Sequence, residues 1–174
     1  ALPVYLASEL EWDFWKVGAF MAIWIIGYGA VQAVAPYLTG KRSGRVPDGR
    51  DAMLWALPLA TAPAFIAYAL NGQMGTEVVL LGGLMLFGFL FAVNSSLHSY
   101  LIVSYASREG ASLDVGFYYM ANAMGRLIGT LLSGWLYQNY GLETCLWVSA
   151  GFIAVTAMLS IALPRANLSS ASIN

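Results

Sequence analysis

Five long stretches that are almost free of charged side chains constrain this chain more than any other feature. They cover about residues 17–40, 52–72, 78–104, 115–138 and 144–164, and the only charge inside any of them is Arg126. A hydrocarbon layer of about 30 Å is crossed by roughly 20 residues of α-helix, so each stretch is long enough to span a membrane. Strands of a membrane barrel are about 10 residues long with alternating polarity, which is a different pattern. The sequence therefore predicts an all-α integral membrane protein with five spanning helices.

The composition excludes a soluble globular domain. Of the 174 residues, 59% are hydrophobic and 10% are charged, whereas soluble domains average about 45–50% and about 25%. Eight basic and nine acidic residues leave a net charge of −1, which argues against nucleic acid as a partner. A single cysteine, Cys145, excludes an internal disulfide and a cysteine-rich zinc site.

The charges between the stretches predict the orientation. If the connections alternate sides, one side carries almost all the basic residues: Lys41, Arg42, Arg45, Arg50, Arg108 and Arg165. The other side carries Lys16 together with Glu9, Glu11, Asp13, Glu77 and Glu143. The positive-inside rule makes the first side cytoplasmic, in a multi-pass protein of the inner (cell) membrane. The basic connection 39–51 is either a topology anchor or a cytoplasmic latch, and residues 1–8 are interpreted as the tail of an earlier span.

The fourth stretch carries a polar stripe centred on Arg126. At 100° per residue, Tyr119, Asn122, Thr130 and Tyr137 all fall within about 40° of that arginine. A charge at this depth costs about 2.5–3.5 kcal/mol on insertion scales and lies too far from either interface to snorkel. No acidic residue lies inside any of the five stretches. Arg126 therefore either pairs with an acid elsewhere in the protein or binds an anion in a central cavity.

Two other stretches carry polar groups at similar depth. Asn94 and His98 share a helical face of the third stretch, and Tyr28 and Gln32 share a face of the first. His98 is either a hydrogen-bonded packing residue or a substrate contact that carries a proton, since histidine titrates near neutral pH. Because Tyr28, Asn94 and Arg126 lie near the middle of three helices, we expect them to converge on a substrate site at the midplane. The second and fifth stretches carry only small polar residues and are expected at the periphery.

Motifs for bond-making chemistry are missing from the sequence. There is no GxxxxGK[ST] phosphate loop, no HExxH motif and no GxSxG motif. The single histidine, without an acid inside the membrane stretches, cannot form a catalytic triad from this chain alone. We therefore predict neither a catalytic residue nor a metal site nor a cofactor.

Several segments resemble organoarsenical efflux permeases of the ArsJ type, a family within the major facilitator superfamily. They are residues 14–36, Pro47-Asp-Gly-Arg50, residues 94–101, the long motif of residues 115–134, and Cys145-Leu-Trp-Val-Ser-Ala150. The resemblance covers nearly the whole chain and implies the C-terminal half of a twelve-helix transporter, from the end of helix seven through helices eight to twelve.

This resemblance implies export of an organoarsenical phosphate ester, such as 1-arseno-3-phosphoglycerate, by alternating access. The expected partners are that small anion, the lipid bilayer and the N-terminal half of the same transporter. The expected substrate-binding residues are Arg126, Asn122, Tyr119, Asn94, Gln32, Tyr28 and His98. Two alternatives remain open: a permease for another organic anion or a drug, and a membrane fragment that transports nothing.

Overall fold

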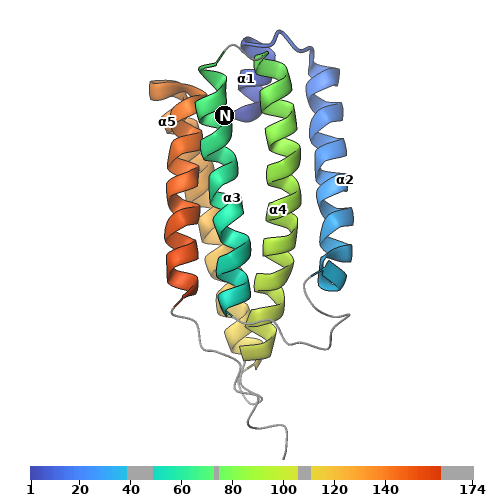
Figure 1. Ribbon diagram of the computed structural model, residues 1–174, viewed down its shortest axis with the longest axis vertical. Coiled ribbons are helices and arrows are strands. Elements are labelled where there is room, and N and C mark those ends of the chain that lie inside the picture. The colour runs from blue at the N-terminus through green and yellow to red at the C-terminus, as the bar shows by residue number, and fades with distance from the viewer. Residues whose placement is uncertain (39–48, 73–74, 106–110, 162–174) are drawn as a thin grey trace, which may run out of the picture.

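The computed structural model describes residues 1–38, 49–72, 75–105 and 111–161, and these residues form helices without any strand (Figure 1). The helices are α1 (Leu2–Ser8), α2 (Phe14–Leu38), α3 (Gly49–Leu70), α4 (Thr76–Tyr105) and α5 (Ala111–Ser160). Most of the basic residues that predicted the orientation lie outside the described residues: Lys41, Arg42, Arg45, Arg108 and Arg165.

Helix α5 consists of two helices that run in opposite directions. Its backbone leaves helical geometry at Gly141, where φ is 82° and ψ is −179°. Figure 1 shows the chain rising along the yellow part of α5 and descending along the red part. We call residues 111–140 the first arm and residues 142–160 the second arm. With these two arms the described residues contain five long helices, one at each of the five apolar stretches.

Each of these helices begins before its apolar stretch does. Asp51, Glu77 and Asp114 lie in the first turns of α3, α4 and α5 instead of in the connections. Acidic side chains stabilise the N-terminal turn of a helix, because the unpaired N–H groups there carry partial positive charge. A charged residue therefore marks the edge of the apolar layer but not the end of the helix.

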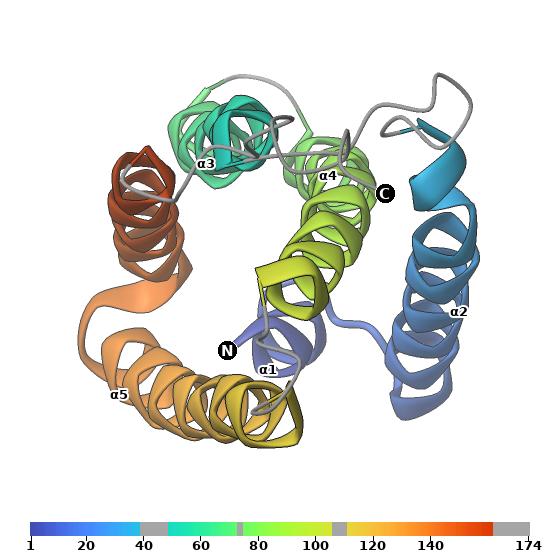
Figure 2. The same ribbon diagram turned by 90° about the horizontal axis from the view of Figure 1, so that it is seen from below.

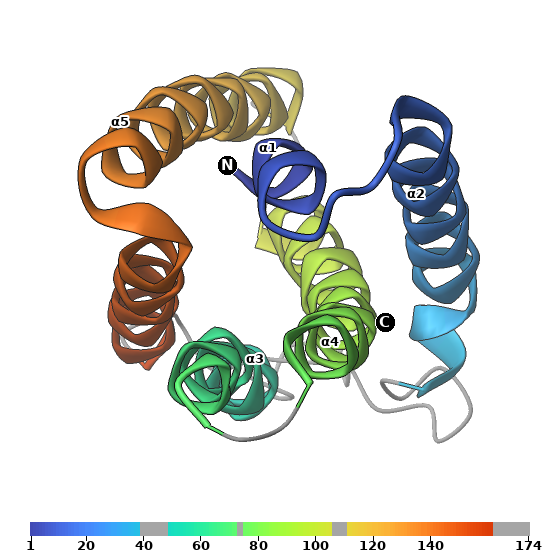
Figure 3. The ribbon, with the colours of Figure 1, turned by 90° about the horizontal axis from the view of Figure 1, so that it is seen from above.

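The helices form an open ring when viewed from either end (Figures 2 and 3). α2 packs against α4, α4 against α3, and α3 against α5. In the end views α3 lies beside the second arm of α5, and α1 lies within the ring. The neighbours in space therefore differ from the order in the chain, because α2 lies beside α4 and not beside α3, the next helix in sequence.

Two buried clusters hold the ring together, one toward each end. At the end that contains α1, the cluster joins Leu6 of α1, Trp12 of the connection before α2, Ile66 of α3, Leu80 of α4 and Leu142 of α5. At the opposite end, Ala52 of α3 packs against Leu97 and Leu101 of α4. The first of these clusters fixes α1 against the turn at Gly141.

The most enclosed helix is not one of those expected to face the interior. Within the most apolar part of each helix, 44% of the α3 residues are buried, against 0% in α2 and 17% in α5. The expectation placed the α3 stretch at the periphery because it carries few polar groups. Among the described residues, α3 is the most enclosed helix because both α4 and the second arm of α5 pack against it.

A glycine pair on α4 gives a matched test of the α3–α4 interface. A methyl group on Gly83 would collide with the fully buried side chain of Ile66, whereas a methyl group on Gly82 would meet open space. We expect Gly83→Ala to destabilise the protein by about 1 to 3 kcal/mol through overpacking. Gly82→Ala is expected to leave the unfolding temperature in detergent unchanged or slightly raised, because alanine favours helix. Equal melting of both variants would contradict this packing.

Candidate functional site

The polar stripe of α5 lies on the face that its first arm turns toward α1. Tyr137 belongs to the stripe, because it lies 11 positions after Arg126, which brings it back to within about 20° of the same direction. Its hydroxyl group lies 3.4 Å from Oγ of Ser8, and its ring packs against the cluster around Leu6. Since α1 lies within the ring (Figure 3), the stripe faces inward along the first arm.

Arg126 lies at the middle of the first arm. It is 15 residues from Ala111 and 15 residues from Gly141 (126 − 111 and 141 − 126), so that roughly 22 Å of helix separates it from either end. Its side chain is exposed, and only its backbone carbonyl takes part in a further bond, from Thr130 Oγ1 at 2.8 Å. No carboxylate within the described residues forms an ion pair with its guanidinium group.

Asn122 and Tyr119 are exposed one and two turns from Arg126. Neither side chain forms a hydrogen bond with a described residue. Every residue from 119 to 131 is exposed, because α5 packs mainly against α3 and only slightly against α4. The stripe thus offers one guanidinium group, one amide and one phenol that are not occupied by neighbouring helices in the described chain.

A second group of expected site residues lies at the α2–α4 interface. Trp24 Nε1 donates to the carbonyl oxygen of Leu84 at 3.0 Å, and its indole lies so close to Gly88 that a methyl group there would touch it. Tyr28 stacks on Trp24 with ring centroids 6.1 Å apart and lies 5.6 Å from Phe91. Trp24 therefore fixes the register of α2 and α4, and this register places the ring of Tyr28 beside Phe91.

This register places Gln32 beside the polar segment of α4. The helices run in the same direction (Figure 1), and the contact of Tyr28 with Phe91 sets an offset of 63 positions (91 − 28). The same offset brings Gln32 level with position 95, next to Asn94. Gln32 is half-buried, so its amide lies at the edge of this interface.

Asn94 and His98 are joined through the backbone of α4. Asn94 is 8% exposed, and its Oδ1 has no hydrogen-bond partner in the described chain. His98 Nδ1 lies 2.9 Å from the carbonyl oxygen of Asn94. A carbonyl oxygen only accepts, so Nδ1 carries a hydrogen, and Nε2 has no hydrogen-bond partner among the described residues.

The structure therefore sorts the seven expected residues into two groups. Tyr28, Gln32, Asn94 and His98 gather on the pair α2 and α4, while Tyr119, Asn122 and Arg126 lie on the first arm of α5. No hydrogen bond between described residues joins the two groups. Sequence reasoning missed the anchoring of Trp24 on Leu84, because only the register of α2 and α4 places this indole against Leu84 and Gly88.

A family model of the Major Facilitator Superfamily matches residues 1–172. The chain belongs to this superfamily. Its members are multi-pass membrane transporters, and the all-helical arrangement is that of part of a major facilitator bundle, which confirms the expected fold and the expected class of function. Curated proteins and solved structures give no match.

Proposed function

We propose that this major facilitator protein is an efflux permease for an organic anion, specifically an organoarsenical phosphate ester such as 1-arseno-3-phosphoglycerate. In this proposal the chain is the C-terminal half of the transporter and works with an N-terminal half in the inner (cell) membrane. The substrate is reached alternately from the two sides of the bilayer.

The single observation that supports an anionic substrate is the position of Arg126. A guanidinium group halfway along a membrane helix needs a counter-charge. The described acidic residues lie in connections, in first helical turns or, for Glu143, beside the turn at Gly141. The planar guanidinium donates two parallel hydrogen bonds to phosphate or arsenate oxygens, which suits a multiply charged ester.

The remaining residues take supporting roles in this proposal. Asn122 and Tyr119 would donate hydrogen bonds to the same anion from neighbouring turns. Asn94, Gln32 and Tyr28 would form the opposite wall of the site. The free Nε2 of His98 is the atom on which proton linkage would act.

Arsenic uptake into everted membrane vesicles tests the substrate. Vesicles that contain the full-length protein are supplied with glyceraldehyde 3-phosphate, NAD, arsenate and the dehydrogenase that forms the ester. We expect arsenic to accumulate only when all four are present, and not with arsenate alone. Uptake of unrelated organic phosphates at the same rate would favour a broader anion permease. No uptake above that of vesicles lacking the protein would contradict the proposal.

A further inference from the structure

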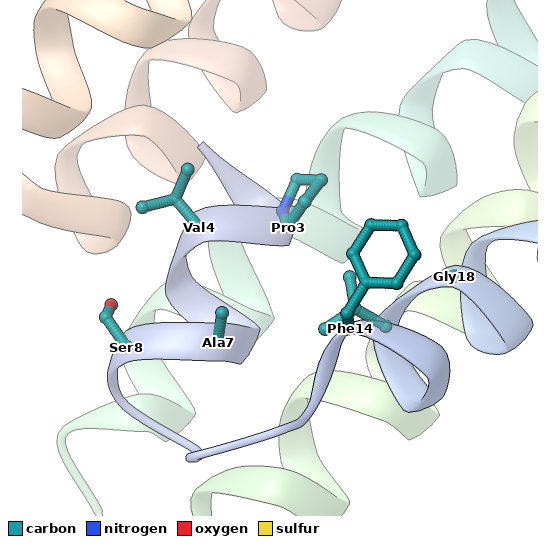
Figure 4. Close-up of a pocket in the computed structure, with 7 residues that line it drawn as sticks. Pro3, Val4, Ala7, Ser8, Phe14 and Gly18 are labelled. Carbon is teal, nitrogen blue, oxygen red and sulfur yellow. The ribbon is translucent and has the colours of Figure 1, made fainter.

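An apolar cleft of about 610 Å³ lies between α1 and the first turns of α2 (Figure 4). Pro3, Val4 and Ala7 line it from α1, and Phe14, Val17 and Gly18 line it from α2. Ligand sites in proteins typically enclose about 300–1,000 Å³. The cleft is therefore large enough for a small ligand or for part of a lipid chain.

The cleft lies at the edge of the membrane layer. The apolar span of α2 begins at Phe14, so the cleft occupies the first turns of a spanning helix. Phe14 and Trp15 are 82% and 81% exposed, and exposed aromatic side chains at the end of a span mark the boundary between acyl chains and headgroups. The cleft therefore lies at the depth where the acyl chains and the headgroup of a phospholipid meet.

Three carboxylates lie in the short connection beside the cleft. Glu9 follows the lining residue Ser8, Asp13 precedes the lining residue Phe14, and Glu11 lies between them. The nearby cation Lys16 is already engaged, because its Nζ lies 3.2 Å from Glu77 and 4.0 Å from the Trp12 ring. Glu9 and Glu11 form no ion pair with any described residue. The potential at this end of the cleft is therefore negative.

The connection that carries these carboxylates is held in place by hydrogen bonds. The backbone N–H groups of Glu9 and Trp12 donate to the carbonyl oxygens of Tyr5 and Leu6 at 2.9 Å and 3.0 Å. The backbone N–H of Lys16 donates to Asp13 Oδ1 at 2.9 Å. Binding a ligand here thus costs little ordering of the protein.

We propose that this cleft binds one acyl chain of phosphatidylethanolamine, with the primary ammonium of the headgroup beside Glu9 and Glu11. The apolar walls suit the acyl chain, and the unpaired carboxylates suit the cationic end of the headgroup. Phosphatidylglycerol offers the same chains without a cation and would be disfavoured by the negative potential. This site is separate from Arg126, so the inference does not depend on which anion is transported.

Photo-crosslinking tests the lipid and its headgroup together. The full-length protein is placed in nanodiscs that contain equal amounts of phosphatidylethanolamine and phosphatidylglycerol, both with the same diazirine-bearing acyl chain. We expect peptides within residues 1–18 to be cross-linked to the ethanolamine lipid about fivefold more often than to the glycerol lipid. A fivefold preference is the upper end of what one exposed ion pair contributes to binding. Peptides from the second arm of α5 are expected to show no preference.

Two pairs of variants separate the headgroup contact from the cleft. Glu9→Gln combined with Glu11→Gln is expected to abolish the preference for the ethanolamine lipid. Glu143→Gln is the control and should retain the preference, because Glu143 is an exposed carboxylate that accepts a hydrogen bond from Trp147 and does not line the cleft. Gly18→Leu fills the cleft and is expected to remove the labelling, whereas Gly29→Leu on the same helix should not. A side chain at either glycine meets open space, so both variants are expected to fold.

Three results would overturn the inference. One is equal labelling of residues 1–18 by the two lipids. Another is a preference that survives the double glutamine variant. The third is cross-linking of the cleft to another segment of the protein in place of lipid, which would mean that the polypeptide itself fills it.

Discussion

Replacing Arg126 with alanine is expected to lower export of the anionic substrate by about 10- to 100-fold. This fold-change corresponds to the free energy that hydrogen bonds to a charged group contribute to binding. Lysine keeps the charge but loses the two parallel hydrogen bonds, so Arg126→Lys is expected to fall between alanine and the native protein. The measurement is the initial rate of substrate uptake into everted vesicles, normalised to the amount of inserted protein.

Ile128→Ala is the matched control for this experiment. Ile128 lies two residues from Arg126 on the opposite face of the first arm and is exposed, so its truncation changes the same region without touching the polar stripe. We expect transport by this variant to stay within about twofold of native, as for surface substitutions generally. Native transport by a correctly inserted Arg126→Ala protein would rule out the arginine as the anion anchor.

Replacing Gly141 with valine is expected to lower the unfolding temperature by about 5 °C or more. The φ of 82° and ψ of −179° at this residue belong to a region that is essentially restricted to glycine. A β-branched side chain there would cost of the order of 1 to 3 kcal/mol, and the reversal between the two arms depends on this backbone conformation. Leu142 of the adjoining buried cluster would be displaced with it.

The buried thiol of Cys145 provides the readout. A thiol-reactive fluorophore in detergent reports the temperature at which this residue becomes accessible. Gly134→Ala is the control, because Gly134 is helical and a methyl group there meets open space; alanine in that position is expected to leave the transition unchanged or to raise it. If valine at position 141 melted like the native protein, the reversal would not depend on glycine.

The positions of the helices could be predicted well, whereas their enclosure could not. Each apolar stretch contains a helix, since backbone groups within a bilayer must satisfy one another along the segment. The helices themselves begin a few residues before the apolar stretches, at Gly49 and Thr76, because charge marks the lipid boundary and the helix continues past it. The polarity of side chains also failed to predict which helix is most enclosed, because α3 is buried through small apolar residues such as Ala52 and Ala56.

The candidate site was predictable only within single helices. A periodicity of 3.6 residues was enough to align Tyr119, Asn122 and Arg126, since residues of one helix keep their relative directions in any packing. The pairing of Tyr28 with Phe91 was not predictable, because it depends on the register between two helices that are 63 positions apart. That register is set by the contact of Trp24 with Leu84 and Gly88.

The sequence by itself determined that this chain belongs in a membrane, where its long apolar helices lie, and that one of them carries an arginine among polar residues on a single face. These properties depend on local composition and on helical geometry. Only the tertiary structure decided that this face turns toward α1, that the chain reverses at Gly141, and that an open apolar cleft lies between α1 and α2. The physical reason is that such features arise from contacts between segments distant in sequence, and the hydrophobic pattern of a membrane helix, apolar on nearly every side, specifies few of them.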